Sequence, residues 1–387
     1  MKFVFLITIA LIAFTMVYSI TAEPMWNIDN IQDVLLALGS DGQNMNKKVL
    51  VEELNQREEN SKIDQLLTTI GLTADVPSGD NVNQLDLRDS AYYSAIARCL
   101  TFGTDWIKNW SCKQCQKVPK LIDVYTGVGK PSDIPWFVGY SPEKNQIVTA
   151  GRSSTSIENW LYDLDFRGVD YSGCSGCQVH QGFMNSYKEL RKDWLNAIDA
   201  LVLKYPTAGI RVEGHSLAAA VATHAVLDLV SGSFTKLDVN GVIYWHNNQH
   251  SGYNDLSDEE FYELTQIPGA SLLTRNKKYN VILPFYNFGS PRVGNEAWSN
   301  YFKKVVGFDS LIRSTHLNDP VPRLPPQNLI WKYQHPSNEI YWYSDSKYKN
   351  CNDHNGEDKT CALGNLFPIN PLDHMWYNGI LLACALI

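Results

Sequence analysis

The chain has 387 residues, of which 44% are hydrophobic and 19% are charged, and this composition excludes a wholly disordered protein. Its formal net charge is −8, from 33 Lys and Arg against 41 Asp and Glu, and no run of basic residues stands out. We therefore expect no nucleic-acid partner. The length suits one large α/β domain with an extension.

The first residues follow the order of a secretory signal peptide. Lys2 precedes an apolar run over residues 3–17, and small residues follow up to Ala22. The alternative is an N-terminal membrane anchor, but the apolar run is short for a span and no basic cluster follows it. We predict a signal peptide over residues 1–22, a secreted, extracellular protein and no integral membrane span.

Cysteine usage agrees with an oxidising compartment. The chain has eight cysteines, and an even number behind a signal peptide indicates disulfides. The C-x-x-C pairs at residues 112–115 and 174–177 have a spacing that zinc sites also use, and zinc is the alternative that secretion disfavours. We expect no metal and no cofactor. The triplet Asn109-Trp110-Ser111 is a sequon, so we predict that Asn109 is glycosylated at the surface.

Residues 23–82 differ in texture from the rest of the chain. They are polar, contain no cysteine and carry short apolar clusters at residues 34–36 and 66–67. The turn-rich stretch 74–80 indicates a boundary. We interpret residues 23–82 as a pro-region or N-terminal extension, with an ordinary helical subdomain as the alternative.

From about residue 83, strand-like runs alternate with helical patterns, which predicts a domain over residues 83–387 with a largely parallel sheet. In chain order we expect a strand at 146–150, a helix through 190–202, a strand at 210–212, a helix at 217–230, and strands at 281–288, 311–313 and 340–343. An insertion over about 231–278 is long for a helix-to-strand link. Because ligands bind at the carboxyl ends of strands, we predict that this insertion points away from the active site.

The strongest local signal lies between Val212 and Ala220, where a strand leads through Gly214-His215-Ser216 straight into a helix. This Gly-x-Ser-x-small turn is typical of a nucleophile elbow, in which small neighbours let the backbone reverse sharply at the serine. The N-terminus of the following helix then directs N–H groups at developing negative charge. Ala218 stands where glycine is usual, which makes the turn tighter. The alternative is a serine in an ordinary strand–helix turn.

A serine nucleophile needs a base that an acid orients, and α/β-hydrolases supply the three in the order serine, acid, histidine. Asp319 follows a strand in a turn-prone stretch and is a reasonable acid, although it is one of 41 acidic residues in the chain. Among the histidines beyond it, His335 and His374 are candidates for the base. Position alone leaves both open.

Several blocks together resemble the secreted class 3 triacylglycerol lipases of the filamentous-fungal type, over about residues 84–387 and in family order. The blocks are Arg152-Ser153-Ser154, residues 159–164, 179–183, 214–217, 289–294, 318–322 and 372–374. The resemblance implies an α/β-hydrolase fold, with a mostly parallel central sheet flanked by helices and a short helical lid. It also implies hydrolysis of ester bonds in acylglycerols at a lipid–water interface.

For the reaction, the resemblance implies Ser216 as nucleophile, Asp319 as acid and His374 as base. It further implies an oxyanion hole formed by Ser154 and the backbone N–H of Leu217. This block departs from the family pattern, because a second serine, at position 153, stands where glycine is usual. That serine is an alternative donor to the oxyanion.

An apolar stripe at helical spacing follows the oxyanion block and resembles the family's mobile lid; its residues are Ile157, Trp160, Leu161 and Leu164. The alternative is a fixed surface helix that packs on the core. The resemblance also implies how the cysteines pair: Cys99 with Cys384, Cys112 with Cys115, Cys174 with Cys177, and Cys351 with Cys361.

We thus predict a secreted, monomeric triacylglycerol lipase that acts through a Ser-His-Asp triad and an acyl-enzyme. One alternative is an esterase with another substrate on the same machinery, such as a phospholipid, galactolipid or feruloyl ester, because one fold hosts many specificities. The other is a non-catalytic lipid-binding relative.

Overall fold

The structure is a computed structural model. It describes residues 26, 31–38, 46–69, 82–154, 156, 165–231, 234–237, 243–246, 279–328, 330–336, 338–353, 356–365 and 370–385. The expected signal peptide, the turn-rich stretch 74–80 and the four residues of the expected lid stripe lie outside the described residues. No described helix is long and apolar enough to cross a membrane.

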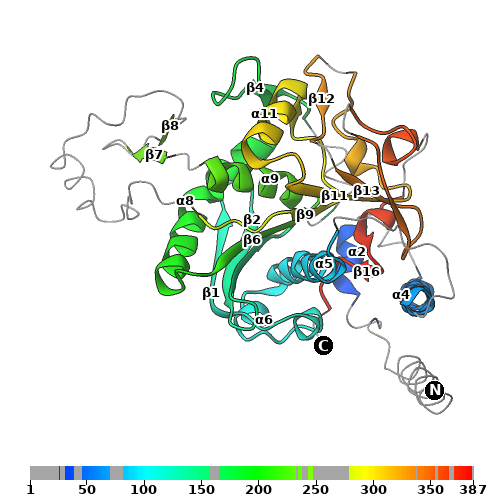
Figure 1. The fold of residues 1–387 in the computed structure, drawn as a ribbon. Coiled ribbons are helices and arrows are strands. Elements are labelled where there is room, and N and C mark those ends of the chain that lie inside the picture. Colours follow the sequence, from blue (N-terminus) through cyan, green and yellow to red (C-terminus); the bar gives the residue numbers. More distant parts are fainter. Residues whose placement is uncertain are drawn as a thin grey trace, which may run out of the picture.

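An eight-stranded sheet lies at the centre of the molecule, in the order β1-β2-β3-β6-β9-β11-β13-β14 (Figure 1). The four neighbouring pairs from β3 to β13 are parallel, and antiparallel pairs complete both edges. The strands are β1 (Ile122–Gly129), β2 (Ile134–Ser141), β3 (Gln146–Gly151), β6 (Gly209–His215), β9 (Phe285–Phe288), β11 (Leu311–His316), β13 (Glu339–Trp342) and β14 (Tyr348–Asn350). The α/β class and the mostly parallel sheet are confirmed.

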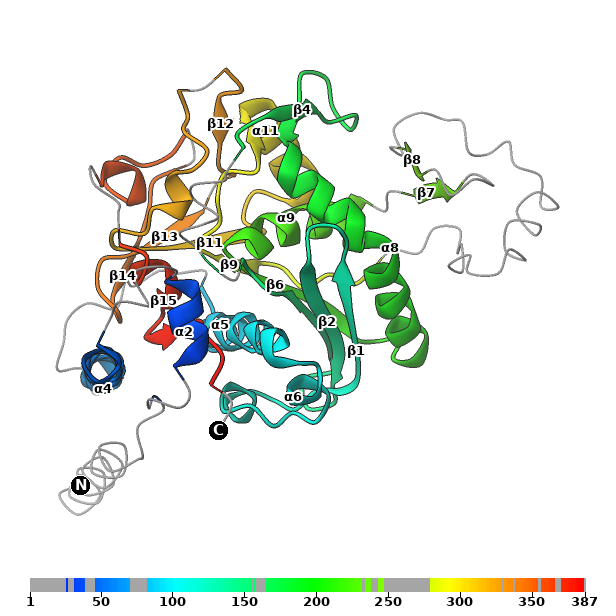
Figure 2. The ribbon, with the colours of Figure 1, turned by 180° about the vertical axis from the view of Figure 1, so that it is seen from behind.

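Helices cover both faces of this sheet (Figures 1 and 2). One face packs on α5 (Gln84–Arg98), and the other packs on α8 (Gln181–Lys204), α9 (Leu217–Ser231) and α11 (Glu296–Val306). The side chains of β2 alternate between the faces, as the pleat of a strand requires: Trp136 and Val138 lie in the α8 core, whereas Phe137 lies beside α5.

One expected strand is shorter than the sequence suggests. Residues 281–288 contain Pro284, which has no N–H to give to a ladder. Before it, Val281 makes an isolated bridge to Ile210, and β9 begins only at Phe285.

Smaller elements surround the central sheet. A four-stranded sheet has the order β12-β10-β5-β4, and β7–β8 and β15–β16 are separate hairpins. These strands are β4 (Gly168–Asp170), β5 (Gln178–His180), β7 (Phe234–Leu237), β8 (Ile243–His246), β10 (Gly294–Asn295), β12 (Tyr333–Gln334), β15 (Trp376–Tyr377) and β16 (Ile380–Leu381). The short helices are α6 (Asp105–Lys108) and the 3₁₀ turns η1 (Cys99–Phe102), η2 (Gln114–Lys117), η4 (Val321–Arg323), η5 (Ala362–Gly364) and η6 (Asp373–Met375).

The described part of the insertion is the β7–β8 hairpin, which pairs Phe234 with His246. Both views place it beyond the C-terminal end of α9, which is the end opposite Ser216 (Figures 1 and 2).

Two helices of the N-terminal extension, α2 (Gln32–Ala37) and α4 (Lys47–Thr69), pack on the C-terminal part of the domain (Figure 1). Their apolar residues share one buried cluster with the region of the C-terminal hairpin; its members include Trp26, Val34, Leu50, Leu54, Val321, Leu372, Met375 and Trp376. The described helices of the extension therefore pack on the domain through this cluster.

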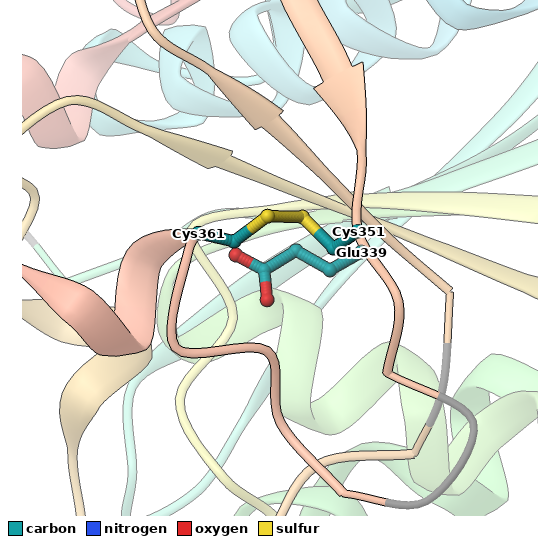
Figure 3. Close-up of side chains that lie close together, drawn as sticks. All are labelled: Glu339, Cys351 and Cys361. Carbon is teal, nitrogen blue, oxygen red and sulfur yellow. A yellow bond between two sulfur atoms is a disulfide. The ribbon is translucent and has the colours of Figure 1, made fainter.

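All eight cysteines are described, and each is disulfide-bonded in the pairs that the resemblance implies. The bond between Cys99 and Cys384 joins the end of α5 to the end of the chain across 285 residues. Glu339 lies beside Cys351 and Cys361 in the spacing of a metal site, but the two sulfur atoms are bonded to each other (Figure 3). This group therefore offers no thiolate to a metal.

Candidate active site

The serine turn joins β6 to α9 at the end of the parallel sheet. Ser216 has a φ of 58°, in the left-handed region that non-glycine residues rarely occupy, and its backbone N–H donates to Phe288 O at 2.9 Å. A side chain at Gly214 would place its Cβ 2.6 Å from Ala219 Cα, so only glycine fits there. The structure therefore forms the sharp strand–turn–helix reversal that the motif predicts.

Ala218 lies opposite another glycine, Gly151. The Ala218 methyl carbon lies 3.5 Å from the position that a Cβ of Gly151 would occupy. Ala218 departs from the family pattern, and a Cβ at position 151 would make an ordinary van der Waals contact with its methyl group.

The acid and the histidine meet although they are 55 residues apart. Asp319 follows β11, and His374 lies in η6; the His374 Nδ1 is 2.9 Å from both carboxylate oxygens of Asp319. Both side chains are buried. Because an ionised carboxylate only accepts, Nδ1 carries the proton and Nε2 of the neutral ring is left as a base.

Asp319 is held by two further donors. The Val321 N–H donates to its Oδ1 at 2.8 Å, and the Tyr377 hydroxyl donates to its Oδ2. Burial, and then the charge of Asp319, raise the pKa of Tyr377 well above its ordinary value, so Tyr377 stays a donor. These bonds fix the carboxylate that orients His374.

The serine turn and His374 lie side by side. The ring of His215, next to Ser216, lies 4.6 Å from the His374 ring between centroids, and its Nε2 donates to the His374 carbonyl at 2.7 Å. A Cβ built on Gly289 would lie 2.7 Å from His374 Cε1. His374 Nε2 is buried and has no hydrogen-bond partner among the described residues, Ser216 Oγ included. Catalytic hydrogen bonds are often longer without substrate.

The other candidate base lies elsewhere. His335 Nε2 donates to Pro322 O at 2.8 Å, and the side chain is buried. Burial, with help from the cationic Arg313 and Arg292, lowers the pKa of His335 well below its ordinary value. The structure therefore brings His374, and not His335, to Asp319.

The block expected to form the oxyanion hole leaves the end of β3. Ser153 is buried and its Oγ accepts from Arg98 Nη1 at 2.6 Å, whereas Ser154 is half-buried and its carbonyl accepts from the same nitrogen at 3.2 Å. Leu217 is the first residue of α9, where helical N–H groups have no intrahelical acceptor. Of the two serines, Ser154 has the more accessible side chain.

Three residues near the site were not singled out from the sequence: Tyr377, Arg98 and Glu213. Tyr377 lies three positions after His374, just beyond the block at residues 372–374. Burial raises the pKa of Glu213, in the strand that carries the serine, to about 7, although Arg211 opposes this shift. Arg98 gave no sequence signal, because its partners are distant along the chain.

Comparison with known proteins gives one family. The model of the family Lipase (class 3) matches residues 148–243 and 267–329, which contain Ser216 and Asp319. Secreted mono- and diacylglycerol lipase 1 of Fusarium solani is 28% identical over 321 residues, which are 79% of each chain. A lipase of Rhizomucor miehei is 28% identical over 274 residues, or 70% of this chain and 62% of that relative.

Solved structures show the same fold. One, described as a serine protease triad forming the catalytic centre of a triacylglycerol lipase, has a TM-score of 0.57 and 26% identity over 77% of this chain and 94% of that chain. Lipase II from Rhizopus niveus has a TM-score of 0.56 at 24% identity, over 78% and 97% of the two chains, which supports the fold alone.

The parallel sheet and the serine turn between β6 and α9 define the chain as an α/β-hydrolase. The family match includes both the serine turn and the acid turn. Over residues 148–243 and 267–329 the chain is similar to the class 3 lipases, and together with the named relatives and the solved lipase structure this similarity supports a carboxylic ester hydrolase.

Proposed function

We propose that this protein is a secreted lipase that hydrolyses acylglycerols with Ser216, His374 and Asp319 as its catalytic triad. One observation carries the assignment: His374 Nδ1 lies 2.9 Å from both oxygens of Asp319, while the ring of His215, next to Ser216, lies 4.6 Å from the same imidazole. The class of substrate rests on relatives named mono- and diacylglycerol lipase and triacylglycerol lipase.

In this mechanism, Ser216 Oγ attacks the ester carbonyl and His374 Nε2 takes its proton. The same histidine then gives the proton to the leaving alcohol, and Asp319 stabilises the imidazolium. Water repeats the cycle on the acyl-enzyme. The Nδ1–carboxylate bond supports this direction of transfer, because it keeps Nε2 free to accept.

The oxyanion formed at the carbonyl is bound by Ser154 and the Leu217 N–H. Each such donor lowers the activation free energy by on the order of 3 kcal/mol. The half-buried position of Ser154, compared with the enclosed Ser153, supports Ser154 as the hydroxyl donor.

The experiment that tests the triad is labelling with a fluorophosphonate, which reacts with an activated serine. We expect one adduct on the native protein, located on Ser216, and none on Ser216→Ala. Ser231→Ala, at the opposite end of α9, is the matched control and should label like the native protein. Absence of labelling on the native protein would leave a lipid-binding relative as the better assignment.

A substrate panel tests the choice of acylglycerol. We expect hydrolysis of mono-, di- or triacylglycerols to exceed that of phosphatidylcholine, galactolipid and feruloyl ester at equal concentrations of labelled enzyme. A preference for one of the latter three would retain the triad and replace the substrate class. The proposal includes a mobile lid. It rests on the apolar residues at 157, 160, 161 and 164, whose spacing is helical.

A further inference from the structure

Helices α2 and α4 each send a charged side chain into the body of the domain. These side chains are Asp33, which lies close to the oxyanion block, and Arg57, which lies close to the acid–histidine pair. The remaining contact is largely apolar, through the cluster that contains Val34 and Leu54. Burying ions costs free energy that apolar residues of similar size would not, so packing alone gives no reason for them.

Asp33 holds Arg98 in a bidentate ion pair. Its carboxylate accepts from Arg98 Nε at 2.6 Å and Nη2 at 2.8 Å, and both side chains are 1% exposed. The guanidinium is a rigid planar fork, so fixing two nitrogens fixes the direction of the third. That third nitrogen, Nη1, donates to Ser153 Oγ and to Ser154 O, at 2.6 and 3.2 Å. Asp33 thus aims Arg98 at the oxyanion block.

Arg57 makes the corresponding contact beside the acid–histidine pair. Its Nη2 lies 3.3 Å from Asp373 Oδ1, and Asp373 Oδ2 accepts from the Asn318 N–H at 3.2 Å. Asp373 immediately precedes His374, and Asn318 immediately precedes Asp319. A single carboxylate, held from α4, therefore joins the turn of the acid to the turn of the base.

The Arg57 side chain is itself fixed. Its Nε and Nη2 donate to Asp345 at 2.9 and 2.6 Å, and its guanidinium lies 5.0 Å from the centroid of the Trp376 ring. Burial opposes ionisation of Asp345, yet His316 and Arg57 lower its pKa to about 2. Asp345 is therefore a charged anchor at any neutral pH.

We propose that helices α2 and α4 are an intramolecular positioning element for ester hydrolysis: Asp33 sets the oxyanion block through Arg98, and Arg57 sets the acid–histidine pair through Asp373. The inference rests on the proposed function. It makes the extension part of the working enzyme, so that losing either contact lowers turnover even where the fold is intact.

The test measures turnover per active serine in full-length variants. One portion of each protein is titrated to completion with fluorophosphonate to count its reactive serines. On the unlabelled remainder, kcat and KM for p-nitrophenyl butyrate are measured well below the unfolding temperature, and kcat is expressed per reactive serine. We expect Arg57→Gln to lower kcat per serine roughly 3- to 10-fold with KM within about 2-fold, because misplaced groups slow the chemical step. Arg57→Lys should recover part of this loss.

Matched controls separate positioning from stability. Leu54→Ala, on the same helix as Arg57, removes buried apolar contacts and touches none of the charged bonds. It should lower the unfolding temperature and leave kcat per labelled serine unchanged. Val34→Ala serves in the same way for Asp33 on α2.

For Asp33, a paired replacement avoids an unfolded protein. Asp33→Asn alone leaves Arg98 buried without a counter-charge, which is strongly destabilising. Asp33→Leu with Arg98→Met removes both charges, and we expect it to fold but to turn over roughly 10- to 100-fold more slowly per serine, because the oxyanion block loses its donor. Arg57 is half-buried, so its variants are expected to fold. If neither Asp33 variant is soluble, turnover per serine in the Arg57 variants alone tests the proposal.

Native kcat per serine in Arg57→Gln and in the paired variant would overturn the proposal and leave the extension a purely structural element. A native protein that takes up no fluorophosphonate would instead overturn the proposed function. The two failures are therefore distinguishable.

Discussion

The two halves of the proposed active site are built in opposite ways. The serine half is a continuous strand, turn and helix over residues 209–231, and its requirements are met locally, such as the glycine at 214. The acid–histidine half joins residues 55 apart and is bounded by side chains from α4 and β15. A nucleophile can therefore be specified by a short motif, whereas its base is specified by the tertiary structure.

The largest expected effect separates the two candidate bases of the nonlocal half. His374→Ala should lower kcat about 10⁴-fold or more, because it removes the proton acceptor of Ser216. His335→Ala should keep most of its turnover per labelled serine while lowering the free energy of unfolding, since it removes a buried donor to Pro322. Steady-state kinetics and urea unfolding measure the two quantities.

A large loss of turnover per labelled serine in His335→Ala, with His374→Ala retaining activity, would reverse the assignment. It would also mean that the contact between His374 and Asp319 is structural.

A smaller effect comes from the glycine where the two halves touch. Gly289 has a φ of 56°, and a Cβ there would lie 2.6 Å from the Tyr377 hydroxyl and 2.7 Å from His374 Cε1. Gly289→Ala should therefore displace the histidine and lower kcat roughly 10- to 100-fold. Gly307→Ala is the matched control: its φ of 119° is also strained, but its nearest Cβ contact is Ser310 at 3.6 Å.

Both variants should lose stability, of the order of 1 to 2 kcal/mol for a left-handed residue. Equal turnover in the two variants would show that strain, and not displacement of His374, determines the effect.

The same contrast explains how far the sequence could be interpreted. Strands at 146–150, 210–212 and 311–313 and the helix after Ser216 follow from local periodicity, and the structure has all of them. The acid and base followed from chain order and resemblance, but position alone left His335 and His374 equal. Arg98 and Arg57 could not be found, because their partners lie 65 and 316 residues away and an isolated arginine has no signature.

A third expectation concerns the apolar stripe after the oxyanion block; the residues of this stripe lie outside the described residues. If Trp160 helps a lid to open onto a lipid surface, Trp160→Ala should lower hydrolysis of emulsified triolein several-fold. Hydrolysis of soluble p-nitrophenyl butyrate should change less. An equal loss on both substrates would contradict the lid and favour a fixed helix that supports the oxyanion block.

The smallest expected effect tests whether the serine half is as local as its motif. Glu213 lies three residues before Ser216, but its Oε1 accepts from Ser90 of α5 at 3.0 Å as well as from Arg211 at 2.8 Å. Burial raises its pKa from 4.5 to about 7, so the folded protein binds a proton that the unfolded chain releases between these values. Stability from this group is therefore present at low pH and lost as the pH rises toward 7.

Glu213→Gln removes this titration and keeps an acceptor for Ser90 and Arg211. Between pH 5 and 7.5, the free energy of unfolding should fall more in the native protein than in the variant, by at most about 3 kcal/mol. Urea unfolding at several pH values measures the difference, and fluorophosphonate labelling at pH 7 should be unchanged. Parallel pH profiles would mean that Glu213 stays ionised beside Arg211 over this range. The strand that carries the serine would then be stabilised by a permanent ion pair and not by protonation of Glu213.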